Sequence, residues 1–165
     1  MRRGQLDLFF DNNQPMKPTI DTPIKLGETY TDPVTSFTGT AMGIIVYLSG
    51  EVRVLVQPAA KEGNTLPPEQ DFAWTRLTNA PKPTAPVYLG TELTDSITGF
   101  KGIAMYAFYM LTGCIGVALQ PQGLDKDGSP HKLRQLDEFR VYKTPDNGPE
   151  KKPGPIEPSH DISAH

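Results

Sequence analysis

The clearest pattern along the chain is a pair of short apolar runs separated by a turn. Residues 44–48 and 52–56 are rich in β-branched and aromatic side chains and have the length of strands. Ser49-Gly50 between them is typical of a tight hairpin turn. Gly39 lies inside the preceding strand pattern, where a glycine indicates a bend or bulge. No segment has sustained helical periodicity, so the pattern predicts an all-β fold.

The same pattern occurs a second time, 63 residues further along the chain. Thr112-Gly113 repeats the hairpin turn of Ser49-Gly50, and Gly102 repeats Gly39. A constant spacing without gaps is explained by duplication of one structural unit. The matching pairs include Leu26/Leu89, Asp32/Asp95, Thr35/Thr98, Phe37/Phe100, Leu48/Leu111 and Gln57/Gln120, while the later pair Arg76/Arg140 requires one inserted residue.

The duplication divides the chain into five parts. Repeat 1 covers residues 22–78 and repeat 2 covers residues 86–143, with a Pro-rich linker over 79–85. Four or five short strands in each repeat favour two tandem small SH3-like barrels. Domains of this size have marginal cores, so we expect them to pack together or to lean on a partner. Residues 1–21 and 144–165 are rich in proline and polar residues and are expected to be disordered arms.

Composition narrows the class of protein. The net charge is −3 and the Lys and Arg residues are scattered, which argues against direct binding to nucleic-acid phosphates. Cys114 is the only cysteine, so we expect neither an internal disulfide nor a cysteine-based zinc site, and a reducing cytoplasm suits the chain. Neither a signal peptide nor a membrane-spanning apolar segment is evident, so no membrane partner is expected. Aromatic residues in the repeats are expected in the core, although four could line a groove: Trp74, Tyr88, Tyr106 and Tyr109.

The residues that usually carry catalysis are scarce. Only three histidines occur, and two fall in the C-terminal arm, which leaves little for a histidine triad or metal site. Asp125–Gly128 resembles the start of a calcium loop but lacks the terminal Glu of an EF-hand, so a solvated turn is favoured. Asp137 and Glu138 would point to opposite faces of one predicted strand, and Cys114 has no cationic neighbour to activate it. We therefore expect no enzymatic activity, no metal and no cofactor.

The N-terminal arm carries an apolar motif in a polar setting. Gln5-Leu6-Asp7-Leu8-Phe9, followed by Phe10, precedes a segment rich in Pro, Asn and Asp over residues 11–23. Such a segment cannot bury enough apolar surface to fold alone. The two Leu and two Phe side chains would gain burial free energy, at about 25 cal/mol per Å², only by entering a pocket. That pocket belongs to a partner, to the chain's own domains or to a neighbouring copy.

This peptide resembles the motif with which bacterial replication and repair proteins bind the DNA sliding clamp, usually written Gln-Leu-Ser/Asp-Leu-Phe. All five positions match, and chance would produce this string in on the order of one in a few thousand chains of this length. The resemblance implies that Leu6, Leu8 and Phe9 fill an apolar pocket of the clamp. It also implies that Gln5 forms a hydrogen bond at the rim of the pocket and that Asp7 stays largely exposed.

Both repeats also resemble a family of short bacteriophage proteins. The shared features are a Thr-Gly-Phe-x-Gly-Ile-Ala turn, here at residues 98–104, a Tyr-Leu-x-Gly-Cys hairpin, here at 110–114, and a Gln-Pro strand end, here at 120–121. Met110 replaces the Tyr of the hairpin, and Tyr47 restores it in repeat 1, which lacks the Cys. The resemblance implies a phage or prophage origin, and hence a bacterial host cytoplasm, more than it implies an activity.

Three functions remain open from the sequence. The first is a non-enzymatic adaptor that docks its N-terminal peptide on a bacterial sliding clamp while its repeats hold a second protein or block the clamp's other clients. The second is a structural protein of the virion, such as a head, neck or tail decoration protein, whose arms lace neighbouring subunits together. The third is a sponge that binds a small nucleotide signal in a pocket between the repeats. The oligomeric state is left open.

Overall fold

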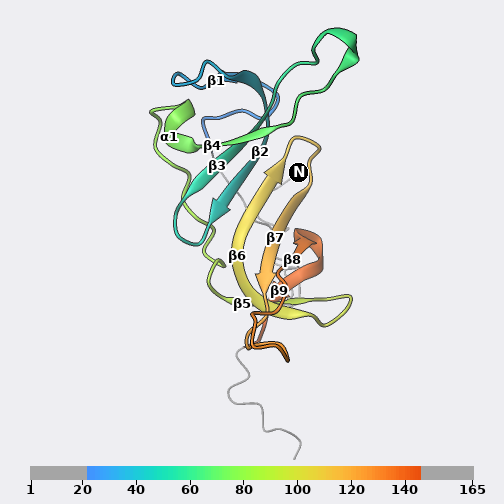
Figure 1. Cartoon of the computed structure of the whole chain (residues 1–165). Coiled ribbons are helices and arrows are strands. Elements are labelled where there is room, and N and C mark those ends of the chain that lie inside the picture. The colour runs from blue at the N-terminus through green and yellow to red at the C-terminus, as the bar shows by residue number, and fades with distance from the viewer. Residues whose placement is uncertain (1–21, 146–165) are drawn as a thin grey trace, which may run out of the picture.

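The computed structural model describes residues 22–145, so the peptide Gln5–Phe10 lies outside the described residues. Nine strands form one antiparallel sheet, with repeat 1 in the upper half of Figure 1 and repeat 2 in the lower half. The strands are β1 (Thr29–Thr31), β2 (Thr38–Tyr47), β3 (Val52–Gln57), β4 (Gln70–Ala73), β5 (Glu92–Asp95), β6 (Lys101–Met110), β7 (Ile115–Gln120), β8 (Arg134–Asp137) and β9 (Val141–Lys143). The short helices are α1 (Trp74–Leu77) and the 3₁₀ turns η3 (Glu62–Asn64) and η4 (Glu138–Arg140).

The predicted all-β fold is confirmed, whereas the expected pair of separate closed barrels is not. The strand order is β4–β3–β2–β6–β5–β9, with β1 pairing with β2, and β7 pairing with both β6 and β8. This path crosses from repeat 1 to repeat 2 between β2 and β6. Because the second halves of these two long strands pair with each other, the repeats share one open sheet.

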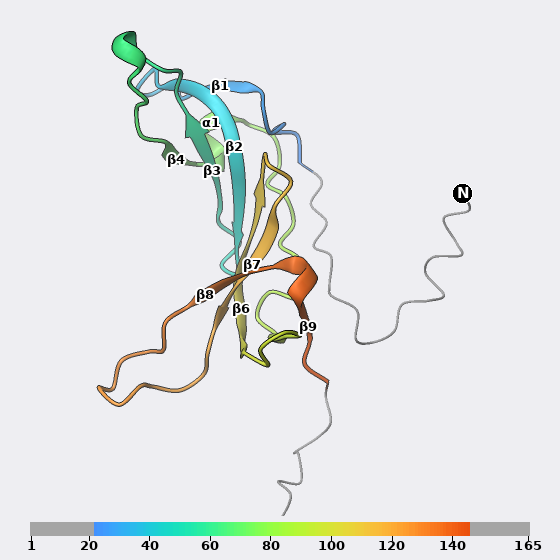
Figure 2. The same ribbon diagram turned by 90° about the vertical axis from the view of Figure 1, so that its right-hand side faces the viewer.

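Each repeat is built around the hairpin that the apolar runs predict. β2 and β3 flank Ser49-Gly50, and β6 and β7 flank Thr112-Gly113. Gly50 and Gly113 have φ angles of 86° and 85°, a region that favours glycine. The long loops that follow β3 and β7 project from opposite ends of the molecule (Figure 2). None of the helices within residues 22–145 combines the length and the apolar character that crossing a membrane requires.

The sequence predicted a bend or bulge at Gly39 and at its repeat equivalent Gly102, but the structure gives a different reason for these glycines. The β-bulges lie slightly further along each strand, between Ala41 and Gly43 in β2 and between Ala104 and Tyr106 in β6. A Cβ on Gly39 would lie 2.5 Å from the carbonyl oxygen of Gln57, and one on Gly102 would lie 2.8 Å from the carbonyl carbon of Gln120. Both glycines therefore permit the close approach of a neighbouring backbone.

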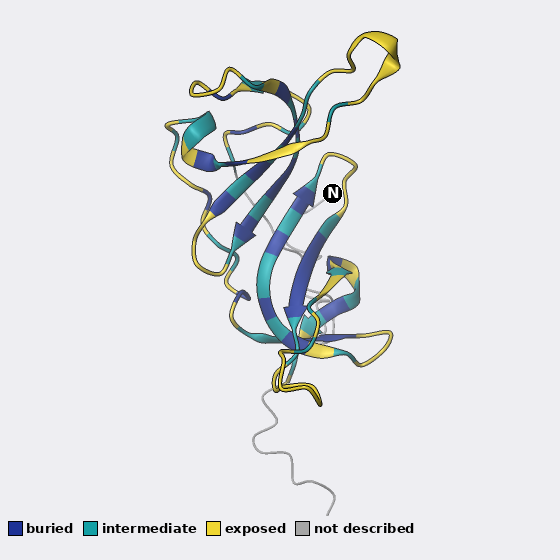
Figure 3. Ribbon diagram, viewed as in Figure 1, coloured by how far each residue is buried: buried dark blue, intermediate teal, exposed yellow. Residues whose placement is uncertain are grey.

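The core lies on one face of the sheet and draws on both repeats. Buried residues alternate with half-buried ones along β2 and β6 (Figure 3), as expected for strands with one covered face. Trp74 of α1 is fully buried, and its indole N–H donates a hydrogen bond to the carbonyl oxygen of Ala80 at 2.9 Å. The cluster includes Ile24, Ile44, Val46, Val54, Val56, Leu93, Tyr109, Val117, Leu119 and Val141.

Repeat 2 has a strand, β9, whose counterpart is missing in repeat 1. β9 pairs with β5, and the N–H of Ser96 donates a hydrogen bond to the carbonyl oxygen of Arg140 at 2.6 Å. Pro33 occupies the position of Ser96 in repeat 1 and has no N–H to donate. In repeat 1 the chain continues from α1 into the linker, and no strand there pairs with β1 in the way that β9 pairs with β5.

Candidate functional site

The two repeats are related by a local twofold axis at the centre of the sheet. The second halves of β2 and β6 pair antiparallel, and the middle of this pairing sets Ile45 opposite Phe108. These two residues are repeat equivalents, because they lie 63 positions apart. Pairing of a residue with its own equivalent is the geometry of an isologous twofold interface. We call the pairing of residues 43–47 of β2 with residues 106–110 of β6 the seam. Its symmetry is that of a homodimer interface, although both halves belong to one chain.

Contacts on either side of the axis occur in matched pairs. The backbone N–H groups of Leu48 and Leu111 each donate a hydrogen bond to the opposite repeat, at 2.8 and 2.7 Å. Their side chains also reach across the seam. A Cβ on Gly90 would lie 3.1 Å from Cδ1 of Leu48, and one on Gly27 would lie 3.4 Å from Cδ1 of Leu111. Each hairpin therefore packs a leucine against a glycine turn of the other repeat.

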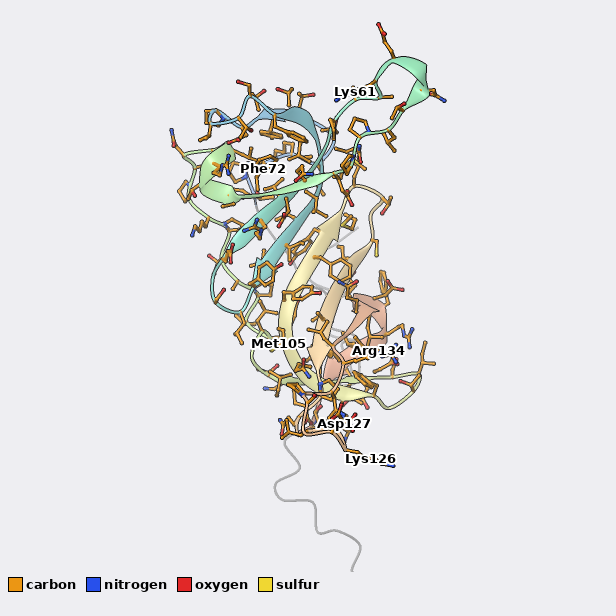
Figure 4. The ribbon with its side chains drawn as sticks, in the orientation of Figure 1. Lys61, Phe72, Met105, Lys126, Asp127 and Arg134 are labelled. Carbon is orange, nitrogen blue, oxygen red and sulfur yellow. The ribbon has the colours of Figure 1, made fainter. Side chains whose placement is uncertain are left out.

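The face of the seam that points away from the core carries aromatic and apolar side chains. These residues alternate with the buried residues of β2 and β6 and are all half-buried. The ring centroids of Tyr47 and Tyr106 lie 5.2 Å apart, and those of Tyr106 and Phe108 lie 6.5 Å apart. Ring-bearing side chains gather along β2 and β6 in Figure 4. We define the central patch as Ile45, Tyr47, Tyr106, Phe108 and Met110.

Polar contacts hold the two flanks of the central patch. On the β3–β4 side, Arg53 forms ion pairs with Glu51 at 2.8 Å and with Asp71 at 2.5 Å. The hydrogen bond with Asp71, followed by the one with Glu51, raises the pKa of Arg53 above its ordinary value. On the β7–β8 side, the side-chain amide of Gln135 donates a hydrogen bond to the hydroxyl of Tyr106 at 2.8 Å. Aromatic side chains with a polar rim are the composition of protein-binding faces.

Each repeat also contains a buried carboxylate that an arginine holds in two hydrogen bonds. Asp32 is fully buried, and Arg76 Nε and Nη2 donate to its two oxygens at 3.0 and 2.5 Å. Asp95 is 1% exposed, and Arg140 donates to it at 3.1 and 2.6 Å. The sequence analysis matched the two aspartates as a repeat pair but did not identify their arginine partners. The signal was present, because Arg76 and Arg140 are themselves a repeat pair.

Hydrogen bonding keeps both carboxylates ionised. Burial alone would raise the pKa of Asp32, but hydrogen bonds from Arg76 and Thr35 outweigh it and lower the pKa to about 2. The hydrogen bonds from Arg140 are the largest influence on Asp95, and with the Thr98 hydroxyl they lower its pKa well below the ordinary range despite burial. Each Asp–Arg pair joins the turn before the long strand of its repeat to the short helix after its fourth strand. That helix is α1 in repeat 1 and η4 in repeat 2. Both pairs therefore brace their repeat at the start of β2 or β6, while the central patch lies on the second halves of these strands.

The other residues singled out from the sequence fall as follows. Trp74, Tyr88 and Tyr109 lie in the core as predicted, whereas Tyr106 is half-buried in the central patch. Asp125–Gly128 forms an exposed turn, as predicted. Glu138 begins η4, so the prediction that it continues one strand with Asp137 is wrong, because the chain bends there before β9.

Cys114 is exposed, and its thiol donates a hydrogen bond to Asp137 at 3.5 Å. Desolvation and this carboxylate raise its pKa, which disfavours the reactive thiolate. Within residues 22–145, no three His, Cys, Asp or Glu side chains gather closely enough to hold a metal ion. Gln5, Leu6, Asp7, Leu8, Phe9 and Phe10 lie outside the described residues, so their role stays a prediction.

Comparison of this chain with protein-family models, with curated proteins and with solved structures finds no match.

Proposed function

We propose that this chain is a non-enzymatic adaptor that docks its N-terminal peptide on a bacterial DNA sliding clamp and holds a second protein on its folded repeats. The observation that carries the proposal is the match of Gln5–Phe9 to all five positions of the clamp motif. Residues 10–21 link this peptide to a body whose described core draws on residues from Ile24 to Val141. A short apolar peptide in a polar arm, together with a separate folded body, supports binding of one protein by the arm and of a second protein by the repeats.

The central patch is the surface on which the body binds its partner. Tyr, Phe and Met side chains are enriched in protein interfaces, and two tyrosines and a phenylalanine meet here on a braced seam. We also propose that repeat 2 is an SH3-like barrel. The strand order β8–β7–β6–β5–β9, with η4 between β8 and β9, supports this assignment. The resemblance of the repeats to bacteriophage proteins supports a setting in the cytoplasm of an infected bacterium.

The clamp interaction is testable by calorimetry with the full-length chain. We expect micromolar affinity, about −8 kcal/mol. Replacing Leu8 and Phe9 by Ala removes two apolar anchors, each worth about 2 kcal/mol or more at a hot spot, so binding should fall by at least about tenfold. Asp7→Ser is the matched control, because Ser is the alternative residue at that position of the motif, and it should bind as the parent does.

A second control separates the arm from the body. Tyr47→Ser alters the central patch and should leave clamp affinity unchanged, while it weakens capture of the second protein. If the full-length chain has no affinity for the clamp, or if Phe9→Ala lowers the melting temperature of the body, the arm serves the chain itself or its assembly. The function as a virion protein with lacing arms would then replace the adaptor.

A further inference from the structure

Repeat 2 contains a cavity at a place where repeat 1 has a large side chain. The cavity has a volume of about 480 Å³, and its lining includes Phe100, Arg134, Leu136 and Arg140. The strand pairings identify the repeat-1 counterparts of these residues. Phe72 pairs with Val54 in repeat 1, and Leu136 pairs with Val117 in repeat 2. Leu136 is therefore the structural equivalent of Phe72.

In repeat 1 the Phe72 ring fills the space between two other side chains. Its centroid lies 5.3 Å from that of Phe37, and the guanidinium carbon of Arg76 lies 5.3 Å from the Phe72 centroid. Phe37 and Arg76 correspond to Phe100 and Arg140 in repeat 2. Leu136 has no ring to place between them, and replacing a large side chain by a smaller one leaves unfilled volume. The repeat-2 cavity is therefore open beside Leu136, between Phe100 and Arg140.

The charge of the cavity also differs from that of repeat 1. Arg134 pairs with Leu119 at the position where repeat 1 has the neutral Gln70. The side chain of Arg134 is exposed and forms no ion pair or hydrogen bond with the described residues 22–145. Arg140 is engaged by Asp95, and these two charges offset each other. The guanidinium of Arg134 therefore adds an uncompensated positive charge beside the open part of the cavity.

We propose that the repeat-2 cavity binds a small aromatic anion, a ring that bears a phosphate or a carboxylate. The ring lies against Phe100 and Leu136, in the open part of the cavity beside the Leu136 side chain. The anionic group binds Arg134, because a planar guanidinium matches phosphate and carboxylate oxygens in pairs. The cavity is open to solvent, and its volume lies in the range of small-ligand sites. Figure 4 labels Phe72 and Arg134, which lie in different halves of the molecule.

The proposal is tested by nuclear magnetic resonance titration of the full chain with adenosine monophosphate, phenyl phosphate and benzoate. At least one of these probes should give saturable shifts in β8 and the Phe100 turn, with a dissociation constant below about 1 mM. The comparison of phenyl phosphate with benzoate distinguishes phosphate from carboxylate. Adenosine and inorganic phosphate each lack one half of the ligand and should bind at least about tenfold more weakly.

The residues at the equivalent positions of repeat 1, Phe72 and Gln70, define two variants that test the cavity. Leu136→Phe should place a ring between Phe100 and Arg140 and so narrow the cavity, and Arg134→Gln should remove its charge. Each installs a side chain that repeat 1 already accommodates at that position. Both should lower the affinity for the probe by at least about tenfold. Lys132→Gln removes an exposed cation outside the cavity lining and should leave binding unchanged.

Three results would overturn the proposal: no saturable shift with any aromatic probe, binding that survives Leu136→Phe, or inorganic phosphate binding as tightly as the aromatic phosphates. The last result would indicate adventitious anion binding at the surface. The double replacement of Leu8 and Phe9 by Ala should not change binding to the cavity. Failure of the clamp interaction and failure of the cavity are therefore separate outcomes.

Discussion

Replacing Gly39 by Ala tests how closely the end of β3 approaches β2. The added Cβ would lie 2.5 Å from the carbonyl oxygen of Gln57, 2.7 Å from its carbonyl carbon and 2.9 Å from the nitrogen of Pro58. All three are backbone atoms, so no change of rotamer relieves the overlap. The strands must instead separate near the pairing of Thr40 with Gln57.

The size of the effect follows from those distances. Nonbonded carbon atoms prefer separations of about 3.5–4.0 Å, so the backbone has to move by roughly 1 Å. Overpacking of this kind costs about 1–3 kcal/mol. The loss of unfolded-state entropy on replacing Gly returns about 0.4–1 kcal/mol. We expect a net loss of about 1–2 kcal/mol, which lowers the melting temperature by roughly 3–10 °C in a domain of this size.

Thermal unfolding followed by circular dichroism, with urea unfolding as a second measurement, checks the prediction. Gly43→Ala is the matched control on the same strand, because its Cβ would meet the flexible end of Met110, with Sδ at 2.6 Å. That side chain can move, so we expect a cost below about 1 kcal/mol. If Gly39→Ala is as stable as the parent, or costs no more than Gly43→Ala, the backbone approach is not the reason for the glycine.

Two further predictions concern the buried Asp–Arg pairs and the pairing of β9 with β5. The pKa of Asp32 falls from 3.8 to about 2 on folding, and that of Asp95 is lowered too, so the stability they contribute is complete above pH 4–5 and is lost as the pH falls toward 2. Melting temperatures measured across that interval should fall, and Asp95→Asn should flatten the slope; an unchanged slope would contradict this role. Ser96→Pro should remove the hydrogen bond to Arg140 and speed amide hydrogen exchange in β9, whereas Pro33→Ser should have little effect on exchange in repeat 1; unchanged protection of β9 would refute it.

Local features of the fold could be read from the sequence because they depend on neighbouring residues. The hairpins at Ser49-Gly50 and Thr112-Gly113 need only two apolar runs and a glycine that tolerates a positive φ. The bend at Glu138, which ends the strand predicted for Asp137 and Glu138 and separates β8 from β9, was missed because it depends on pairing with β5. Asp32 and Arg76 lie 44 residues apart, so their contact required knowledge of which strands adjoin.

The sequence by itself determined the strand content, the duplication and the motif of the N-terminal arm. Alternation along a strand defines two faces, but it does not say which edge pairs with which. Only the tertiary structure decided that β2 pairs with β6 at Ile45 and Phe108, and hence that the repeats form one open sheet. That pairing moved Tyr106 from the expected core to an outward patch beside Tyr47. The physical reason is that edge pairing and side-chain exposure depend on contacts between residues far apart in the chain.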